Sequence, residues 1–138
     1  MSTEEVISSA RDASTVVADM LDAVADRRID AAIAALTDDI DWHNVSLPKI
    51  RGIKRVSKVM HLLAKPTWGF EVTMHNIASH GDVVLTERTD VLRWRRWRIE
   101  FWVCGTFELR NGKIAVWRDH FDYGNFLRGA VVGALRAL

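Results

Sequence analysis

The feature that most constrains this chain is a strand-like segment, Leu85–Leu92, with charged side chains on both faces. It is rich in β-branched and apolar residues, holds no Gly or Pro, and follows a turn signal at Ser79–Asp82, so we predict a β-strand. Period-two geometry places Arg88 and Asp90 on one face and Glu87 on the other. If helices cover this sheet, at least one charge is buried, and a buried charge needs a partner or a shifted pKa.

A second carboxylate lies near the end of another predicted strand, Lys113–Phe121. If the sheet brings Asp119 of this strand beside Arg88 and Asp90, one guanidinium lies between two carboxyl groups and can hold them close while their pKa values separate. Such a pair suits general acid and general base catalysis. The alternative is an internal salt bridge that fixes the register of the strands, because charged strand residues alone are weak evidence of function.

Length and composition favour one domain over residues 1–138, with 49% hydrophobic and 27% charged residues. The net charge of +1 gives no general affinity for polyanions, the single Cys104 excludes an internal disulfide, and the histidines lack metal-ligand spacing. We therefore expect no metal, no cofactor and no nucleic-acid partner. Residues 1–13 are polar and acidic, which predicts a loose N-terminal arm rather than a signal peptide. No apolar stretch is long enough to cross a bilayer, so we expect a cytoplasmic protein without a membrane partner.

The predicted elements run from helices to strands, which favours an α+β fold. Helices are predicted at Thr15–Ala25, Asp30–Leu36, Ile53–Leu63 and Tyr123–Ala137, and strands at Asp38–Asn44, Gly69–Ala78, Val83–Trp94, Arg98–Arg110 and Lys113–Phe121. Asn111-Gly112 is a strong hairpin signal between the last two strands. We predict a cone: one curved, mostly antiparallel sheet with helices on its concave side and a pocket at its open end.

Three further features allow more than one interpretation. The run Arg93–Arg98 mixes arginine with two tryptophans, as surfaces that bind nucleic acids do, but a hairpin tip whose arginine stems shield the tryptophans is favoured. Cys104 lies in mid-strand, where a buried small hydrophobic residue is a better interpretation than a nucleophile. The C-terminal helix carries Leu127, Val131 and Leu135, and it could attach to a membrane, cover the pocket or form part of a dimer interface.

The segments Thr86–Asp90 and Trp117–Asp122, with Asn44 upstream, form a combination that resembles the limonene-1,2-epoxide hydrolase family. Val84–Asp90 and Phe101–Gly105 look like the actinobacterial branch, in particular its mycobacterial members. The resemblance covers most of the chain, from the first predicted helix to Asp122. It implies a cone-shaped, cystatin-like fold of the nuclear-transport-factor-like or SnoaL-like type, usually assembled as a homodimer.

The resemblance also implies a one-step, cofactor-free hydrolysis of an epoxide to a vicinal diol, without a covalent ester intermediate. Asp119 would act as general base on a water, Asp90 would protonate the epoxide oxygen, and Arg88 would bridge the two carboxyl groups. Asn44 would help to hold the water. The scheme requires Asp90 protonated and Asp119 ionised near neutral pH, which a dry pocket and a shared arginine can arrange.

At one position the sequence departs from the family pattern. Trp42 stands where the family has a tyrosine whose hydroxyl also holds the water. An indole N–H can donate a hydrogen bond but cannot accept one. We therefore expect the water to lose one acceptor or to be held differently in this chain.

Apolar side chains near these positions suggest the substrate class. The predicted pocket residues are Trp42, Met74, Phe101, Val103, Phe121 and Phe126. They suit a small apolar epoxide of terpenoid, sterol or lipid origin. Two rivals share the same cone fold: a non-catalytic domain that binds a hydrophobic small molecule, and an isomerase or cyclase. The carboxyl groups favour the hydrolase, since a carrier does not need them.

Overall fold

The structure, a computed structural model, describes residues 12–138. Its helices are α2 (Ala13–Ala25), α3 (Ile29–Ala34), α4 (Ile53–Leu63) and α5 (Tyr123–Ala137), and its strands are β1 (Leu36–Asn44), β2 (Ile50–Arg51), β3 (Trp68–His80), β4 (Val83–Trp94), β5 (Trp97–Arg110) and β6 (Lys113–Phe121). The predicted N-terminal arm lies outside the described residues except for its last two, Asp12 and Ala13. These two belong to α2, because the Asp12 carboxylate caps the helix by accepting from the Ser14 backbone N–H.

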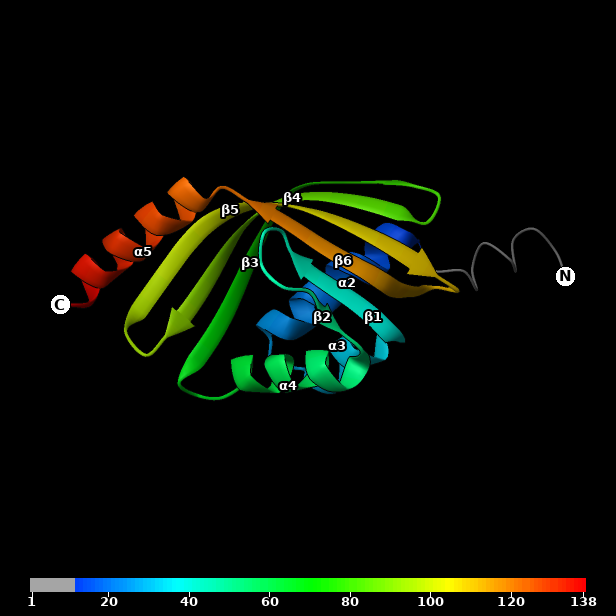
Figure 1. The fold of residues 1–138 in the computed structure, drawn as a ribbon, viewed down its shortest axis with the longest axis horizontal. Coiled ribbons are helices and arrows are strands. Elements are labelled where there is room, and N and C mark those ends of the chain that lie inside the picture. The colour runs from blue at the N-terminus through cyan, green and yellow to red at the C-terminus, as the bar shows by residue number, and fades with distance from the viewer. Residues whose placement is uncertain (1–11) are drawn as a thin grey trace, which may run out of the picture.

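One sheet contains the six strands of the described part, in the order β2-β1-β6-β5-β4-β3. Neighbouring strands are antiparallel except for β1 and β6, which pair in parallel (Figure 1). The predicted α+β fold with a curved, mostly antiparallel sheet is thus confirmed. The sequence reasoning did not anticipate the parallel pair or the two-residue strand β2 beside β1.

The helices α2, α3 and α4 lie on the same side of the curved sheet, as Figure 1 shows. Their apolar faces meet the concave face of the sheet in one core, which excludes water from side chains of both layers. Fully buried members include Leu21 of α2, Val56 of α4, Ile40 of β1, Phe107 of β5 and Ile114 of β6. This core closes one end of the cone and leaves the other end free for a cavity.

The helix α5 packs along the edge of β5 rather than over the concave face (Figure 1). Because β6 pairs with β5 only from Val103 onward, the first half of β5 has a free edge. Asn125 Oδ1 accepts from the Trp102 backbone N–H at 3.0 Å, and Trp97 Nε1 donates to the Ala130 carbonyl at 2.9 Å. Gly129 leaves room for the Glu100 carbonyl, where a Cβ would collide. The helix therefore replaces a missing strand at this edge.

Most predicted boundaries match the structure, and the differences have local causes. The predicted helix Asp30–Leu36 ends at Ala34, because Leu36 is buried as the first residue of β1. Arg95 forms the turn of the β4–β5 hairpin with φ +56°, and its guanidinium lies 5.2 Å from the Trp94 ring, which agrees with the predicted hairpin tip. Cys104 is partly exposed rather than buried. Within residues 12–138 no helix combines the length and apolarity of a membrane span.

Candidate active site

The register of the sheet brings the predicted functional residues together. Thr86 of β4 pairs with Gly105 of β5, which in turn pairs with Asp119 of β6. Asn44, at the end of β1, lies opposite Asp119 through the parallel pairing. Side chains at paired positions share a face, so Thr86, Asn44 and Asp119 meet on the concave side of the sheet.

A fully buried arginine joins the two carboxyl groups. Arg88 Nε and Nη2 donate to the two carboxyl oxygens of Asp90 at 2.8 and 3.0 Å, which is a bidentate pair. Nη2 also donates to Asp119 Oδ2 at 2.7 Å, and Nη1 donates to Thr86 Oγ1 at 3.1 Å. Because all three charged side chains are buried, these contacts are shielded from solvent and fix the carboxyl groups in place.

Asp119 has two carboxyl oxygens in different environments. Its Oδ2 accepts from Arg88 and also from Trp117 Nε1, at 3.0 Å. Its Oδ1 is buried and has no hydrogen-bond partner among the described residues. A buried carboxylate oxygen without a donor is costly, so a donor such as water is expected at this atom.

The titration of the site follows from burial and charge. Burial raises the pKa of Asp90, the Arg88 charge and hydrogen bonds counteract it, and the Asp119 charge raises it further, with a net increase. Burial by itself would lower the pKa of Arg88, but the charges of Asp119 and Asp90 outweigh it, so that pKa is raised. Arg88 is therefore a permanent cation, while Asp90 keeps a proton to a higher pH than an ordinary aspartic acid.

The cavity at the open end of the cone has a volume of about 280 Å³ and is mostly apolar. Its lining is Val24, Trp42, Asn44, Leu47, Val59, Met60, Leu63, Phe70, Asp90, Leu92, Phe101, Val103, Trp117, Asp119, Phe121 and Phe126. Of the pocket residues predicted from the sequence, only Met74 is misplaced. It packs against the core instead, and Phe70, further along β3, takes its place on the wall. Arg88 lies beneath Asp90 and Asp119 and does not reach the cavity.

Trp42 lies on the cavity wall and stacks on Trp117, with ring centroids 4.4 Å apart and an interplanar angle of 15°. Its Nε1 is buried and has no hydrogen-bond partner among the described residues. Trp117 thus contacts Trp42 through its ring and Asp119 through its N–H. Stacking of this kind fixes the orientation of both indoles and so steadies the Asp119 carboxyl group.

Sequence reasoning missed three residues that support the site: Thr86, Gly105 and Trp117. Thr86 accepts from Arg88, and its own hydroxyl donates to the Gly105 carbonyl at 3.4 Å. The alternation in β4 places Thr86 on the same face as Arg88, and the same alternation in β6 relates Trp117 to Asp119, so spacing alone could have suggested both. Only the register of three strands reveals Gly105.

Replacing Gly105 by Ala is expected to disturb the site directly. A Cβ at this position would lie 2.5 Å from Arg88 Nη1, 2.7 Å from Thr86 Oγ1 and 2.9 Å from Asp119 Oδ1. Arg88 and Thr86 are held by hydrogen bonds to each other and to their neighbours, and Asp119 is held only through Oδ2, so the Asp119 carboxyl group must move. A misplacement of about 1 Å can cost about 100-fold in turnover. Steady-state kinetics measures this loss. Gly112→Ala is the matched control, because its Cβ meets no atom and it lies in a hairpin turn outside the site. At φ +78° the new side chain strains the turn and lowers stability, but the folded variant should keep full turnover. Full turnover in Gly105→Ala would contradict this geometry.

Comparison with known proteins identifies relatives of the chain. The family described as "Limonene-1,2-epoxide hydrolase catalytic domain" matches residues 11–131. The epoxide hydrolase EphG of Mycobacterium tuberculosis is 41% identical over 113 residues, which cover 82% of this chain and 75% of that protein.

Two solved structures have a similar fold. An LEH-like epoxide hydrolase from M. tuberculosis superposes with a TM-score of 0.85 at 39% identity, over 89% of this chain and 92% of that one. An NTF2-like protein from Burkholderia pseudomallei has a TM-score of 0.73 at 16% identity, over 87% and 98% of the two chains, and supports the cone fold alone. The chain therefore belongs to the limonene-1,2-epoxide hydrolase family and is an epoxide hydrolase of that type.

Proposed function

We propose that this enzyme hydrolyses an apolar epoxide in one step by general acid and general base catalysis, without a covalent intermediate. The observation that carries the proposal is a buried Asp90–Arg88–Asp119 group whose two carboxyl groups face a mostly apolar cavity. Water attacks one epoxide carbon while the C–O bond to the ring oxygen breaks. The water proton passes to Asp119, the Asp90 proton passes to the ring oxygen, and the product is a vicinal diol.

Asp90 is assigned as the acid because its environment favours the protonated form. Burial and the nearby Asp119 charge both raise its pKa. Ring strain makes the epoxide reactive, and protonation of the oxygen as the bond breaks avoids an alkoxide in an apolar cavity.

Asp119 is assigned as the base because its Oδ1 is free to accept a proton. Arg88 and Trp117 both donate to Oδ2, which leaves Oδ1 for the water. Asn44 lies opposite Asp119 and lines the cavity, so its side-chain amide is the second group proposed to hold this water. A base must be within hydrogen-bond reach of the proton that it removes, and this arrangement supplies such a place.

The cavity suggests the size of the substrate. Its volume of about 280 Å³ lies just below the usual range of ligand pockets, about 300 to 1,000 Å³. Aromatic and aliphatic walls, including Phe101, Phe121 and Phe126, favour hydrocarbon over polar groups. Among the terpenoid, sterol and lipid epoxides suggested by the sequence, a terpenoid or a single lipid chain fits this volume better than a whole sterol.

The test of the mechanism is a single-turnover reaction in oxygen-18 water with terpene, styrene, fatty-acid and sterol-type epoxides. Direct attack by water puts one label in every diol formed in the first turnover. Attack by a carboxylate would instead form an ester, and the first-turnover diol would then carry oxygen from the enzyme. Unlabelled diol in the first turnover would overturn the one-step mechanism, and no turnover on any of these substrates would overturn the proposed substrate class.

The rate should depend on pH through Asp90. The protonated form is the acid, so kcat/KM is expected to fall as the pH rises through the pKa of Asp90, which lies above the ordinary value of 3.8. The free energy of unfolding should fall over the same interval, because between pH 3.8 and that raised pKa the folded chain binds the proton more tightly than the unfolded chain. A pH profile of kcat/KM with a non-ionisable epoxide checks the rate prediction. Denaturant unfolding at several pH values checks the stability prediction. A rate that rises steadily with pH would contradict the acid role.

Trp42→Tyr is expected to raise turnover, by about threefold to tenfold, because a phenol oxygen at this position could accept from the water as well as donate. The smaller ring also gives up part of the stack on Trp117. Trp42→Phe is the matched control, since it shrinks the ring in the same way but has no hydroxyl. If Tyr and Phe have the same effect on kcat, the hydroxyl does not take part.

We also propose a homodimer, as the family resemblance implies. Large apolar side chains are exposed on α5 and on the sheet, among them Leu85, Leu127 and Leu135, none of which lines the hollow beside α5. Sedimentation equilibrium of the full chain tests this proposal, and a monomer at micromolar concentration would refute it.

A further inference from the structure

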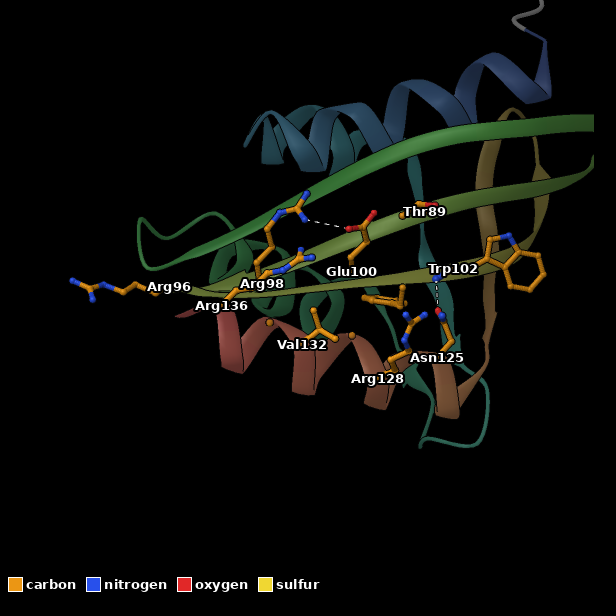
Figure 2. A pocket seen from close by; sticks show the side chains of 12 residues that line it. Thr89, Arg96, Arg98, Glu100, Trp102, Asn125, Arg128, Val132 and Arg136 are labelled. Atoms are coloured by element: carbon orange, nitrogen blue, oxygen red, sulfur yellow. Dashed lines mark hydrogen bonds and ion pairs between the residues drawn. The ribbon is translucent and has the colours of Figure 1, made fainter. Parts of the chain in front are cut away.

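A second hollow lies between α5 and the convex face of the sheet. Its volume is about 470 Å³, and it is lined by Thr89, Arg96, Arg98, Glu100, Phe101, Trp102, Asn125, Arg128, Gly129, Val132, Gly133 and Arg136 (Figure 2). Only Phe101 also lines the catalytic cavity. Along α5 the Gly129 backbone lies close against the Glu100 carbonyl, so helix and strand separate the two spaces.

Positive charge is in excess around this hollow. Four arginines line it against one carboxylate, Glu100. That carboxylate is already bound, because Arg98 Nη1 lies 3.2 Å from it, and Arg98 is paired a second time through its Nε, 3.8 Å from Glu71. Arg96, Arg128 and Arg136 have no hydrogen-bond or ion-pair partner within residues 12–138. Guanidinium groups that share one hollow repel one another, and a bound anion would relieve that repulsion.

The helix α5 presents these groups on one face. Arg128, Val132 and Arg136 are four residues apart, so they lie above one another on α5. In Figure 2 Arg128 and Val132 rise from α5 toward β5, whereas Arg96 extends away at the hairpin tip. Asn125 uses Oδ1 to accept from the Trp102 backbone, so its side-chain NH₂ is left to donate. Arg128 and Arg136 are therefore the cations available to a ligand, with an amide donor at one end and the already paired Arg98 beside them.

We propose that this hollow binds an organic phosphate, at a site separate from the catalytic cavity. A guanidinium donates two parallel hydrogen bonds to one oxoanion edge, so a carboxylate satisfies one arginine while a phosphate can satisfy several. The volume exceeds that of a bare phosphate ion, and the exposed Trp102 ring and Val132 offer an apolar surface for an organic body. Binding here requires no chemistry and does not depend on the proposed mechanism of hydrolysis.

The experiment is an isothermal calorimetric titration of the full chain with phenyl phosphate at low salt. Phenyl phosphate should bind more tightly than benzoate, which has the same ring but a carboxylate, and more tightly than inorganic phosphate, which has no ring. Arg128→Gln and Arg136→Gln should each weaken binding by about tenfold, the typical value of one charge-assisted hydrogen bond. Arg55→Gln, at an exposed arginine of α4 outside the hollow, is the matched control and should leave binding unchanged.

Three outcomes would overturn the proposal. Absence of saturable binding, or equal weakening in Arg55→Gln, would mean that the arginines are ordinary surface charge. Val132→Glu places a carboxylate among the arginines and should abolish phosphate binding while the oligomeric state stays the same. If Val132→Glu instead breaks an oligomer of the wild-type chain, the hollow is a contact between copies. Diol formation should be unchanged in all these variants, so failure of this site is distinguishable from failure of the catalytic assignment.

Discussion

Asp119→Asn is expected to lower the rate of diol formation by about 10³-fold, near the middle of the range for loss of a general base. The amide oxygen must take the place of Oδ2, because Arg88 and Trp117 both donate there. The amide NH₂ then replaces Oδ1, the atom that has no partner among the described residues. It would present a donor to the water instead of an acceptor. The variant thus loses the base and also orients the water wrongly.

The same substitution is expected to act on the acid as well. The Asp119 charge contributes to the raised pKa of Asp90, while Arg88 lowers it. When the Asp119 charge is removed, the pKa of Asp90 falls, and less of the acid is protonated at neutral pH. The residual activity of Asp119→Asn should therefore decline at lower pH than the wild-type activity does. Arg88 keeps Asp90 as a bidentate partner, so the variant should still fold.

Asp38→Asn is the matched control for this variant. Asp38 is an exposed carboxylate on β1, outside the cavity, and its loss should leave turnover unchanged. Binding of an apolar ligand, such as the diol product, should persist in Asp119→Asn and so separate loss of chemistry from loss of the pocket. Turnover within a few-fold of wild type would show that Asp119 is not the base.

The sequence predicts those features of the site that depend on patterns among neighbouring residues. The β4 strand was predicted because its alternation is local, and that alternation alone put Arg88 and Asp90 on one face. Asn111-Gly112 predicted its hairpin for the same reason, and both residues adopt the positive φ that such a turn requires, +53° and +78°. Local patterns therefore predicted the strands β4, β5 and β6 correctly.

The features that sequence reasoning missed depend on contacts between distant segments. The parallel pairing of β1 with β6, which puts Asn44 opposite Asp119, joins elements far apart in the chain and leaves no local pattern. Met74 was predicted to line the pocket because it is apolar and lies in a predicted strand. The pairing of β3 with β4 shifts register directly after Met74, and the Met74 side chain packs against the core. Phe70 therefore lines the cavity on β3 in place of Met74. Periodicity shows which face of a strand a residue occupies, but it does not show whether that residue lies beside the cavity or beside the core.

Arg88→Met is the second variant with a large expected effect, and it acts on stability as well as on turnover. Arg88 is fully buried and donates to Asp90, Asp119 and Thr86. An apolar side chain of similar length leaves two buried carboxyl groups without their cation. At neutral pH the free energy of unfolding should fall by about 3–5 kcal/mol, the usual cost of removing one partner from a buried ion pair. Denaturant unfolding measures this change, and diol formation should be lost.

This stability loss should depend on pH, with a sign fixed by the carboxyl groups. A buried carboxyl group that is neutral needs no cation, so Arg88→Met should be less destabilised at acidic pH. As the pH rises, the unfolded chain ionises freely while the folded variant must bury unpaired anions, so its stability falls relative to wild type. Arg118→Met is the control. It removes a surface ion pair with Glu108, 3.5 Å long, and should change stability by no more than about 1 kcal/mol.

A triple variant separates the cost of unpaired charge from the loss of packing. Adding Asp90→Asn and Asp119→Asn to Arg88→Met removes both carboxylates, so the pH dependence should disappear and part of the lost stability should return. The triple variant would be more stable than Arg88→Met at pH 8 and still inactive. That result would mean that the buried arginine is retained for catalysis, because a group without charges can fill the same space. If the triple variant were instead less stable than Arg88→Met at pH 8, the hydrogen bonds rather than the charges would hold this part of the sheet together.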